Sequence, residues 1–162
     1  MSEKKELLTA GAANVVIEIP INAPVSRTWS TMIIDISRWW RKDFLICEDS
    51  KGMTIEPRVG GLLFERAGLE GCGYAWGQII SFQPDKHLGY IAQIVPPWGG
   101  PAQSVVQISL KADESNPHTT VLTLTDSLIG HVSEDLMSCL DDGWRQLFGE
   151  GGLKSYIENN GN

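Results

Sequence analysis

Residues 53–128 consist of short segments with β-strand character, and each segment ends at a cluster of residues that favour turns. These connections are too short for crossovers, which join parallel strands through about a dozen residues or more. We therefore expect antiparallel pairing, with a short edge strand at 53–57 followed by five further strands. The turn signals are Gly60–Gly61, 68–73, Pro84–Asp85, 96–101 and Asn116–Pro117.

The residues before this region favour one more strand and two helices. The run from Asn14 to Asn22 is rich in β-branched residues and predicts a first strand. Pro24 suits the first position of a helix, and apolar residues recur behind it at helical spacing. A second short helix is expected from Asp35 to Arg41. Two short helices therefore follow the first strand.

A long amphipathic helix closes the chain. Ser133 is a suitable N-cap, and the two acidic residues behind it suit the positive end of the helix dipole. Glycines within 149–152 predict a kink, or a break with helix resuming at Leu153, because each interior glycine costs about 0.5–1 kcal/mol relative to alanine. The apolar face comprises Leu136, Leu140, Trp144 and Leu147. We expect this face to lie across the sheet.

The order of these elements predicts an α+β fold. We expect a curved antiparallel sheet of about six to seven strands wrapped around the C-terminal helix. The 162 residues suffice for one domain at 13–160, preceded by a flexible leader at 1–12. Whether the space between sheet and helix is filled or hollow decides what such a domain can bind.

Charge and cysteine content disfavour several classes of function. The formal net charge of −7 opposes binding to nucleic acids and anionic membranes, and no apolar run reaches the length of a membrane span. The three cysteines are far apart and lack zinc-ligand spacing, which indicates reduced thiols and a cytoplasmic location. No nucleophile elbow, phosphate-binding loop or dinucleotide fingerprint occurs, so we expect no metal and no cofactor.

The sequence contains four blocks whose order and spacing are informative: IEIPINAPVSRTWSTMIID, EPRVGGLLFE, YAWGQIISFQPDKHLGY and DDGWRQLFGEGGLKSYIE. Together they resemble the START-like helix-grip superfamily (SRPBCC), and within it the family homologous to the C-terminal domain of the heat-shock protein 90 ATPase activator. The resemblance covers residues 14–159. It implies a cavity between a long helix and an incomplete β-barrel, where a hydrophobic small molecule binds.

Two positions depart from the pattern of similar sequences. Ala92 stands where they often carry a tryptophan, and Asp126 stands where they often carry a histidine. The resemblance therefore implies a cavity enlarged at Ala92 and a second carboxylate near Glu65.

Glu65 is the first candidate for a functional group. It shares one side of its strand with Leu63, because side chains alternate across a strand. A buried carboxylate needs polar partners, so an inward Glu65 indicates a polar use; the alternative is a solvated side or strand end. Glu65 and Asp126 are candidates for a coupled acid–base pair, whereas on separate faces they would titrate independently.

Alternation assigns other candidates to faces of the sheet. The segment at 74–82 is expected to place Tyr74, Trp76, Gln78, Ile80 and Phe82 on one face. The next segment places Leu88, Tyr90, Ala92 and Ile94 together, and the last places Leu122, Leu124 and Asp126 together. Tyr90 and Gln78 can form hydrogen bonds with a ligand, or satisfy backbone groups of the sheet instead.

Tryptophans supply the aromatic candidates for a cavity wall. Core packing alone explains Trp40 and Trp144. Trp98 lies in a proline-rich loop where a core does not need an indole, so a lid or a partner contact suits it. The full set of predicted ligand-binding residues is Glu65, Trp76, Gln78, Tyr90, Ala92, Trp98, Asp126, Leu140 and Trp144.

Three functions are compatible with these residues. The favoured one is binding of a small hydrophobic or aromatic molecule, driven by apolar burial and oriented by a few polar side chains. The second is an enzyme of the cyclase or hydrolase type that uses Glu65 and Asp126 as acid and base. The third is a protein-interaction module, a co-chaperone of the stress response that stimulates a chaperone ATPase. An exposed sheet edge also suits a homodimer.

Overall fold

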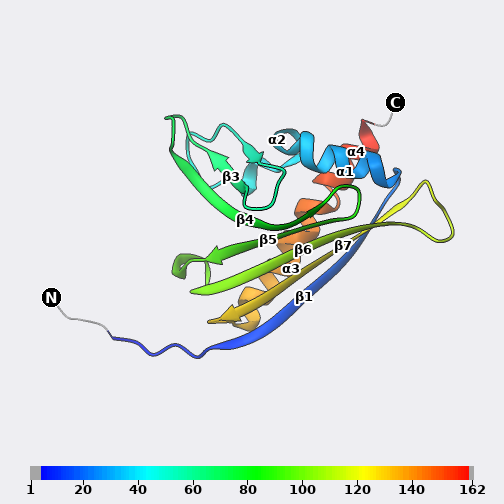
Figure 1. The fold of residues 1–162 in the computed structure, drawn as a ribbon. Helices are drawn as coiled ribbons and strands as arrows, with labels where there is room; N and C mark the ends of the chain where they lie inside the picture. The colour runs from blue at the N-terminus through cyan, green and yellow to red at the C-terminus, as the bar shows by residue number, and fades with distance from the viewer. Residues whose placement is uncertain (1–4, 161–162) are drawn as a thin grey trace.

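The computed structural model describes residues 5–160; residues 1–4 of the predicted leader lie outside this range (Figure 1). The strands are β1 (Gly11–Ile21), β2 (Met53–Ile55), β3 (Leu62–Arg66), β4 (Gly73–Gln83), β5 (His87–Ile94), β6 (Ala102–Ala112) and β7 (Thr120–Gly130). The helices are α1 (Val25–Ile34), α2 (Ile36–Trp39), α3 (Glu134–Phe148) and α4 (Leu153–Asn159), with 3₁₀ turns η1 (Lys42–Phe44) and η2 (Pro96–Trp98).

The strands form one antiparallel sheet in the order β1-β7-β6-β5-β4-β3-β2. β1 pairs with β7 from Gly11 opposite Gly130 to Ile21 opposite Thr120. It therefore begins before the predicted start at Asn14, because its first residues still pair with β7. The division into a leader at 1–12 and a domain at 13–160 stays a prediction. The predicted α+β fold is confirmed: two short helices follow the first strand, and a long helix follows the last.

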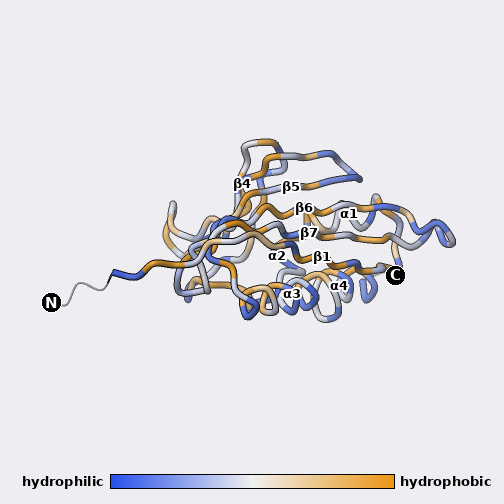
Figure 2. Tube along the Cα trace, turned by 90° about the horizontal axis from the view of Figure 1, so that it is seen from below, coloured by the Kyte–Doolittle hydropathy of each residue, from blue (hydrophilic) through white to orange (hydrophobic). Residues whose placement is uncertain are grey.

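The C-terminal helices cover one face of the sheet, which we call the inner face. In Figure 1, α3 crosses behind the strands, and Figure 2 shows α3 and α4 together on one side of β1, β6 and β7. Leu147 and Phe148 at the end of α3, and Leu153 and Ile157 in α4, are at most 2% exposed. The tightly packed core therefore lies beneath the end of α3 and beneath α4.

Aromatic side chains from α1 and α2 close the same part of the core. The ring centroid of Trp39 lies 5.4 Å from that of Phe148, and its indole N–H donates to the carbonyl of Met32 at 3.1 Å. Trp40 is buried beside it, in agreement with the prediction that core packing explains this residue. The first turns of α3 lie beyond this cluster and contribute fewer buried side chains.

The boundary between α3 and α4 lies where the glycines predicted it. Ser133 caps α3 by accepting the Leu136 N–H at 3.1 Å, as its sequence position predicts. α3 ends at Phe148 and α4 begins at Leu153, so the predicted break is confirmed. At Gly152 a Cβ atom would lie 1.8 Å from the carbonyl oxygen of Leu147. Only glycine allows the chain to turn this closely.

Two register shifts interrupt the pairing of β4, one with β3 and one with β5. Each shift is a bulge that inserts a residue, bends the strand and changes which side chains face inward. Ile79 is buried as a result, whereas Gln78 and Ile80 are exposed. The prediction that alternate residues from Tyr74 to Phe82 share one face is therefore wrong for Gln78 and Ile80. Bulges arise from pairing between strands, and the period-two pattern of one segment does not reveal them.

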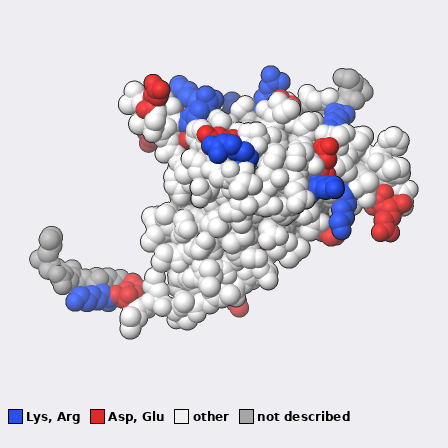
Figure 3. All heavy atoms as spheres, in the orientation of Figure 1, with Lys and Arg blue, Asp and Glu red and all other residues white. Residues whose placement is uncertain are grey.

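The outer face of the sheet carries little charge. Figure 3 shows Lys, Arg, Asp and Glu gathered over the loops around β3 and at the turn between β6 and β7, while the area over the middle strands is uncharged. Along β7, threonines and Ser127 alternate with the buried residues of the inner face. Charged side chains are thus kept away from the broad outer side of the sheet.

Two glycines with opposite surroundings give a stability test. Gly152→Ala is expected to destabilise the protein by more than about 1 kcal/mol, because the added Cβ overlaps a backbone carbonyl. Gly143→Ala, within α3, is expected to stabilise it by about 0.4–1 kcal/mol, since its Cβ would find only Phe44 at 3.6 Å. Urea unfolding of both variants measures the difference, and equal effects would contradict the close approach at Gly152.

Candidate functional site

A cavity of about 650 Å³ lies between the inner face of β4–β7 and the first turns of α3; we call it the inner cavity. Residues 43–46, after α2, and Trp98 in η2 complete its walls. The side chains that matter most for its chemistry are Tyr74, Trp76, Tyr90, Ala92, Ser104, Asp126, Leu140 and Trp144. The cavity therefore combines a largely aromatic and apolar wall with a few polar groups.

Small side chains on the inner face leave this space open. Ala92 of β5 lies directly opposite Ser104 of β6, and both line the cavity. Neither fills the gap between the sheet and α3, in contrast to the Leu122 and Leu124 positions farther along β7, which are fully buried. The cavity thus begins where the inner face changes from large aliphatic residues to small ones.

Asp126 is fully buried at the base of the inner cavity. Alternation along β7 places it inward together with Leu124, as predicted. Its carboxylate accepts a hydrogen bond from the Ser104 hydroxyl and another from the indole N–H of Trp144 at 2.9 Å. Burial raises the pKa of Asp126, and these two donors oppose the rise. Trp144 thereby connects α3 to the sheet through a hydrogen bond, a role that core packing alone does not describe.

Tyr90 is the second polar group of the cavity. It lies opposite Val106, which in turn lies opposite Asp126, so the three form a row across neighbouring strands. Its ring packs against Gly77, where a Cβ would come within 2.6 Å of the ring. Burial and the charge of Asp126 raise the pKa of Tyr90, so the phenol stays neutral. Its hydroxyl forms no hydrogen bond with the described residues.

Glu65 is also fully buried on the inner side of β3. Its carboxylate accepts the backbone N–H groups of Ile46 and Cys47, each at 2.8 Å. Burial acts to raise the pKa of Glu65, but these backbone donors, together with the Ser50 and Trp76 side chains, outweigh it and hold the pKa below its usual range. The indole N–H of Trp76 has no hydrogen-bond partner, yet lies close enough to help keep that pKa low.

This geometry gives Glu65 a positioning role. It fastens the segment containing Ile46 to β3, and that segment forms a wall of the inner cavity, which Glu65 itself does not line. The structure does not bring Glu65 and Asp126 together as the candidate acid–base pair, because three strands separate β3 from β7 and each carboxylate has its own donors. The curvature and order of the sheet, which the sequence alone does not reveal, keep the two groups apart.

The structure brings together most of the predicted site residues. Those that line the inner cavity are Trp76, Tyr90, Ala92, Trp98, Asp126, Leu140 and Trp144. Gln78 lies outside it on the exposed side of β4. Sequence reasoning missed Ser104, although alternation with the buried Val106 would have placed it inward, and it missed Cys139, an exposed residue of α3 at the cavity. No sequence signal marks Gly77 as the residue under the Tyr90 ring.

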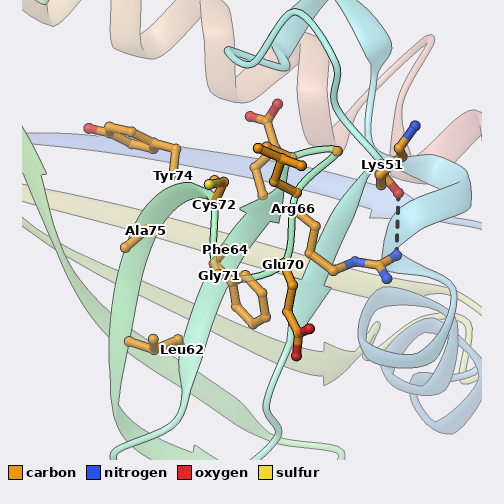
Figure 4. Close-up of a pocket in the computed structure, with 14 residues that line it drawn as sticks. Lys51, Leu62, Phe64, Arg66, Glu70, Gly71, Cys72, Tyr74 and Ala75 are labelled. Atoms are coloured by element: carbon orange, nitrogen blue, oxygen red, sulfur yellow. Dashed lines mark hydrogen bonds between the residues drawn. The ribbon is translucent and has the colours of Figure 1, made fainter.

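A second hollow, of about 640 Å³, lies between β3, β4 and the loop at 67–73 (Figure 4). Charged side chains border it, and Arg66 donates to the carbonyl of Lys51 at 3.3 Å. Cys72 and Leu69 in its wall are exposed. Because water reaches these groups, the hollow offers weaker discrimination between ligands than the inner cavity does.

Among residues 5–160, no cluster of three or more histidine, cysteine, aspartate or glutamate side chains is placed to hold a metal ion. Within the same range, every helix is too short or too polar to cross a membrane.

No protein-family model matches the chain, and no curated protein matches it. Several solved structures are similar to this chain. An uncharacterised protein from Rhizobium leguminosarum is 16% identical over 96% of this chain and 100% of its own, with a TM-score of 0.63. Protein MLL2253 from Mesorhizobium loti is 20% identical over 91% of this chain and 98% of its own, with a TM-score of 0.63.

The structure of Ara h 8.0201 has a TM-score of 0.67 at 11% identity and covers 93% of this chain and 100% of its own. Identities this low show a shared fold and nothing about activity. The predicted fold is confirmed on this basis: the chain has the helix-grip fold of START-like and Bet v 1-like proteins.

The two backbone hydrogen bonds to the buried Glu65 carboxylate predict a loss of stability at low pH. Glu65→Gln is expected to cost about 1–3 kcal/mol at pH 7, because the amide presents its NH₂ group to one of the two backbone N–H donors. The pKa of Glu65 is lower in the folded protein, so its contribution is complete above the unfolded value of about 4.3 and is lost as pH falls through the folded value.

Urea unfolding between about pH 2 and about pH 7 measures this effect. The difference between the native protein and Glu65→Gln is expected to narrow below about pH 4. Glu48→Gln, an exposed substitution in the same segment, serves as the control and should leave stability nearly unchanged. If the free energy of unfolding differs between the native protein and Glu65→Gln by the same amount at every pH, the Glu65 carboxylate does not stabilise the fold in its ionised form.

Proposed function

We propose that this protein binds a small hydrophobic or aromatic molecule in the inner cavity. The volume of about 650 Å³ falls within the range of about 300–1,000 Å³ that is usual for small-molecule sites. Apolar and aromatic side chains dominate its wall, and a few polar groups converge on it. This combination favours binding driven by apolar burial, with orientation supplied by hydrogen bonds.

The observation that carries the proposal is the free hydroxyl of Tyr90 beside the hydrogen-bonded group of Asp126, Ser104 and Trp144. Asp126 already accepts from Ser104 and Trp144, whereas Tyr90 is 4% exposed and forms no hydrogen bond with the described residues. Tyr90 lines the inner cavity, so its hydroxyl is available to pair with water or with a ligand there. A ligand atom that pairs with the hydroxyl would supply that partner.

The remaining cavity residues suggest roles in holding the ligand. Leu140 and Trp144 on α3 and Trp76 on β4 all line the cavity, so a flat ligand would bury apolar surface against both the helix and the sheet. Trp98 is 45% exposed and lies edge-on to Tyr74, with ring centroids 5.3 Å apart. This position at the rim suits a cover over the bound molecule.

The other two predicted functions have less support. An acid–base enzyme built on Glu65 and Asp126 would require the two carboxylates to share a substrate, and three strands lie between the strands that carry them. A co-chaperone role, and membership of the family homologous to the ATPase activator, rest on the four sequence blocks and stay predictions. A homodimer, a chaperone partner and a cytoplasmic location likewise stay predictions.

Filling the cavity tests the proposal. Ala92→Trp places an indole in the inner cavity, opposite Ser104, and is expected to weaken binding of the uncharged fluorescent probe N-phenylnaphthylamine at least about tenfold. Gln107→Trp adds the same side chain on the exposed side of the neighbouring strand and should leave binding unchanged. Probe titration measures both, with thermal unfolding as the check on folding.

Native mass spectrometry of the purified protein provides an independent measurement. A retained small molecule in the native protein that is absent from Ala92→Trp would support the inner cavity as its site. Equal probe affinity for the native protein and Ala92→Trp would show that hydrophobic molecules bind elsewhere, and the proposal would fail.

A further inference from the structure

We infer that the inner cavity selects ligands whose aromatic or hydrophobic body carries a positively charged nitrogen, an organic ammonium, over neutral and anionic analogues. This inference rests on the proposed function, because it names the chemical class of the ligand in the same cavity. It follows from the charges, rings and hydrogen bonds of the cavity wall.

The charges of the wall are of one sign. Two carboxylates, Asp43 and Asp126, line the inner cavity, and none of its described lining residues is lysine, arginine or histidine. Asp43 is already neutralised by the Arg41 guanidinium, which donates to both of its oxygens at 3.0 and 2.6 Å. The uncompensated charge of the cavity is therefore that of Asp126.

Asp126 is buried without a cation. Its two hydrogen-bond donors, Ser104 and Trp144, are neutral groups, and no ion pair joins it to a basic side chain within residues 5–160. A buried carboxylate of this kind is stable only with difficulty in its charged form, unless a positive charge comes near. An ammonium group on the ligand would supply that charge in a region of low dielectric constant, where it interacts strongly.

The aromatic rings of the cavity wall also favour a positively charged ligand. Phe44, Tyr74, Trp76, Trp98 and Trp144 all line the inner cavity. The face of an aromatic ring carries negative charge density and attracts cations, including organic ammonium groups. The rim already contains one such contact, with the Arg41 guanidinium 5.6 Å from the centre of the Phe44 ring.

Tyr90 supplies the direct contact for the ligand. The Asp126 carboxylate is fully covered, so its charge acts on a ligand through space, whereas the Tyr90 hydroxyl remains free to accept a hydrogen bond. An ammonium N–H that donates to this hydroxyl would lie near the row formed by Tyr90, Val106 and Asp126. A ligand carboxylate at the same place would face Asp126 without any basic group to offset the repulsion.

Three probes of similar shape test the charge preference: naphthylmethylamine, naphthylmethanol and naphthoate. Calorimetric titration of the native protein at neutral pH is expected to show the amine binding about tenfold to hundredfold more tightly than the alcohol, as for hydrogen bonds to a charged group. Naphthoate is expected to bind more weakly than the alcohol. This ranking is measured on the native protein and needs no variant.

A matched substitution locates the source of the preference. Asp126→Asn removes the charge while keeping an acceptor for Trp144 and a donor toward Ser104. It is expected to bring the amine-to-alcohol affinity ratio to within about threefold of one, with little change for the alcohol. Glu114→Gln, an exposed carboxylate in the turn between β6 and β7, removes the same charge elsewhere and should preserve the ratio.

The outcomes separate the two proposals. If the alcohol and naphthoate bind as tightly as the amine, and Ala92→Trp weakens all three, the charge preference is wrong while the cavity remains the binding site. If no probe binds the native protein, or Ala92→Trp binds all three unchanged, the cavity is not the site and both proposals fail. Retention of the ratio in folded Asp126→Asn would also overturn the assignment to this carboxylate.

Discussion

The structure depends on covering a wide sheet with one long helix. Seven strands at a spacing of about 4.8 Å span roughly 29 Å, whereas a helix with its side chains is about 10–12 Å across. α1, α2 and α4 complete the cover at one end, where the core is densely packed. At the other end only α3, η1 and η2 close over the strands. An interior space there is a direct result of this mismatch in width.

The two buried carboxylates show how the same functional group is handled in two ways. Glu65 receives two backbone N–H donors, which keep it ionised and fix a loop in place. Asp126 receives one hydroxyl and one indole, and burial prevails over them in setting its pKa. The first arrangement stabilises the fold, whereas the second leaves an unbalanced group beside an open space. Glu65 thus stabilises the fold, whereas Asp126 is the acidic residue on which the proposed ligand preference depends.

Much of this architecture could be predicted from the sequence because its determinants are local. Short turns imply antiparallel pairing, the alternation of Leu122, Leu124 and Asp126 places the carboxylate inward, and the glycines after Phe148 end the helix. The position of Gln78 could not be predicted, because bulges in β4 depend on β3 and β5. The distance between Glu65 and Asp126 depends on strand order, which is a property of the whole chain.

The positions of two cysteines have a practical consequence. Cys139 is exposed at the wall of the inner cavity, whereas Cys72 is exposed in the separate hollow between β3 and β4. Both thiols are open to solvent, but they border different hollows of the same molecule. Slower alkylation of Cys139, with Cys72 as the internal reference, would therefore report occupation of the inner cavity beside it.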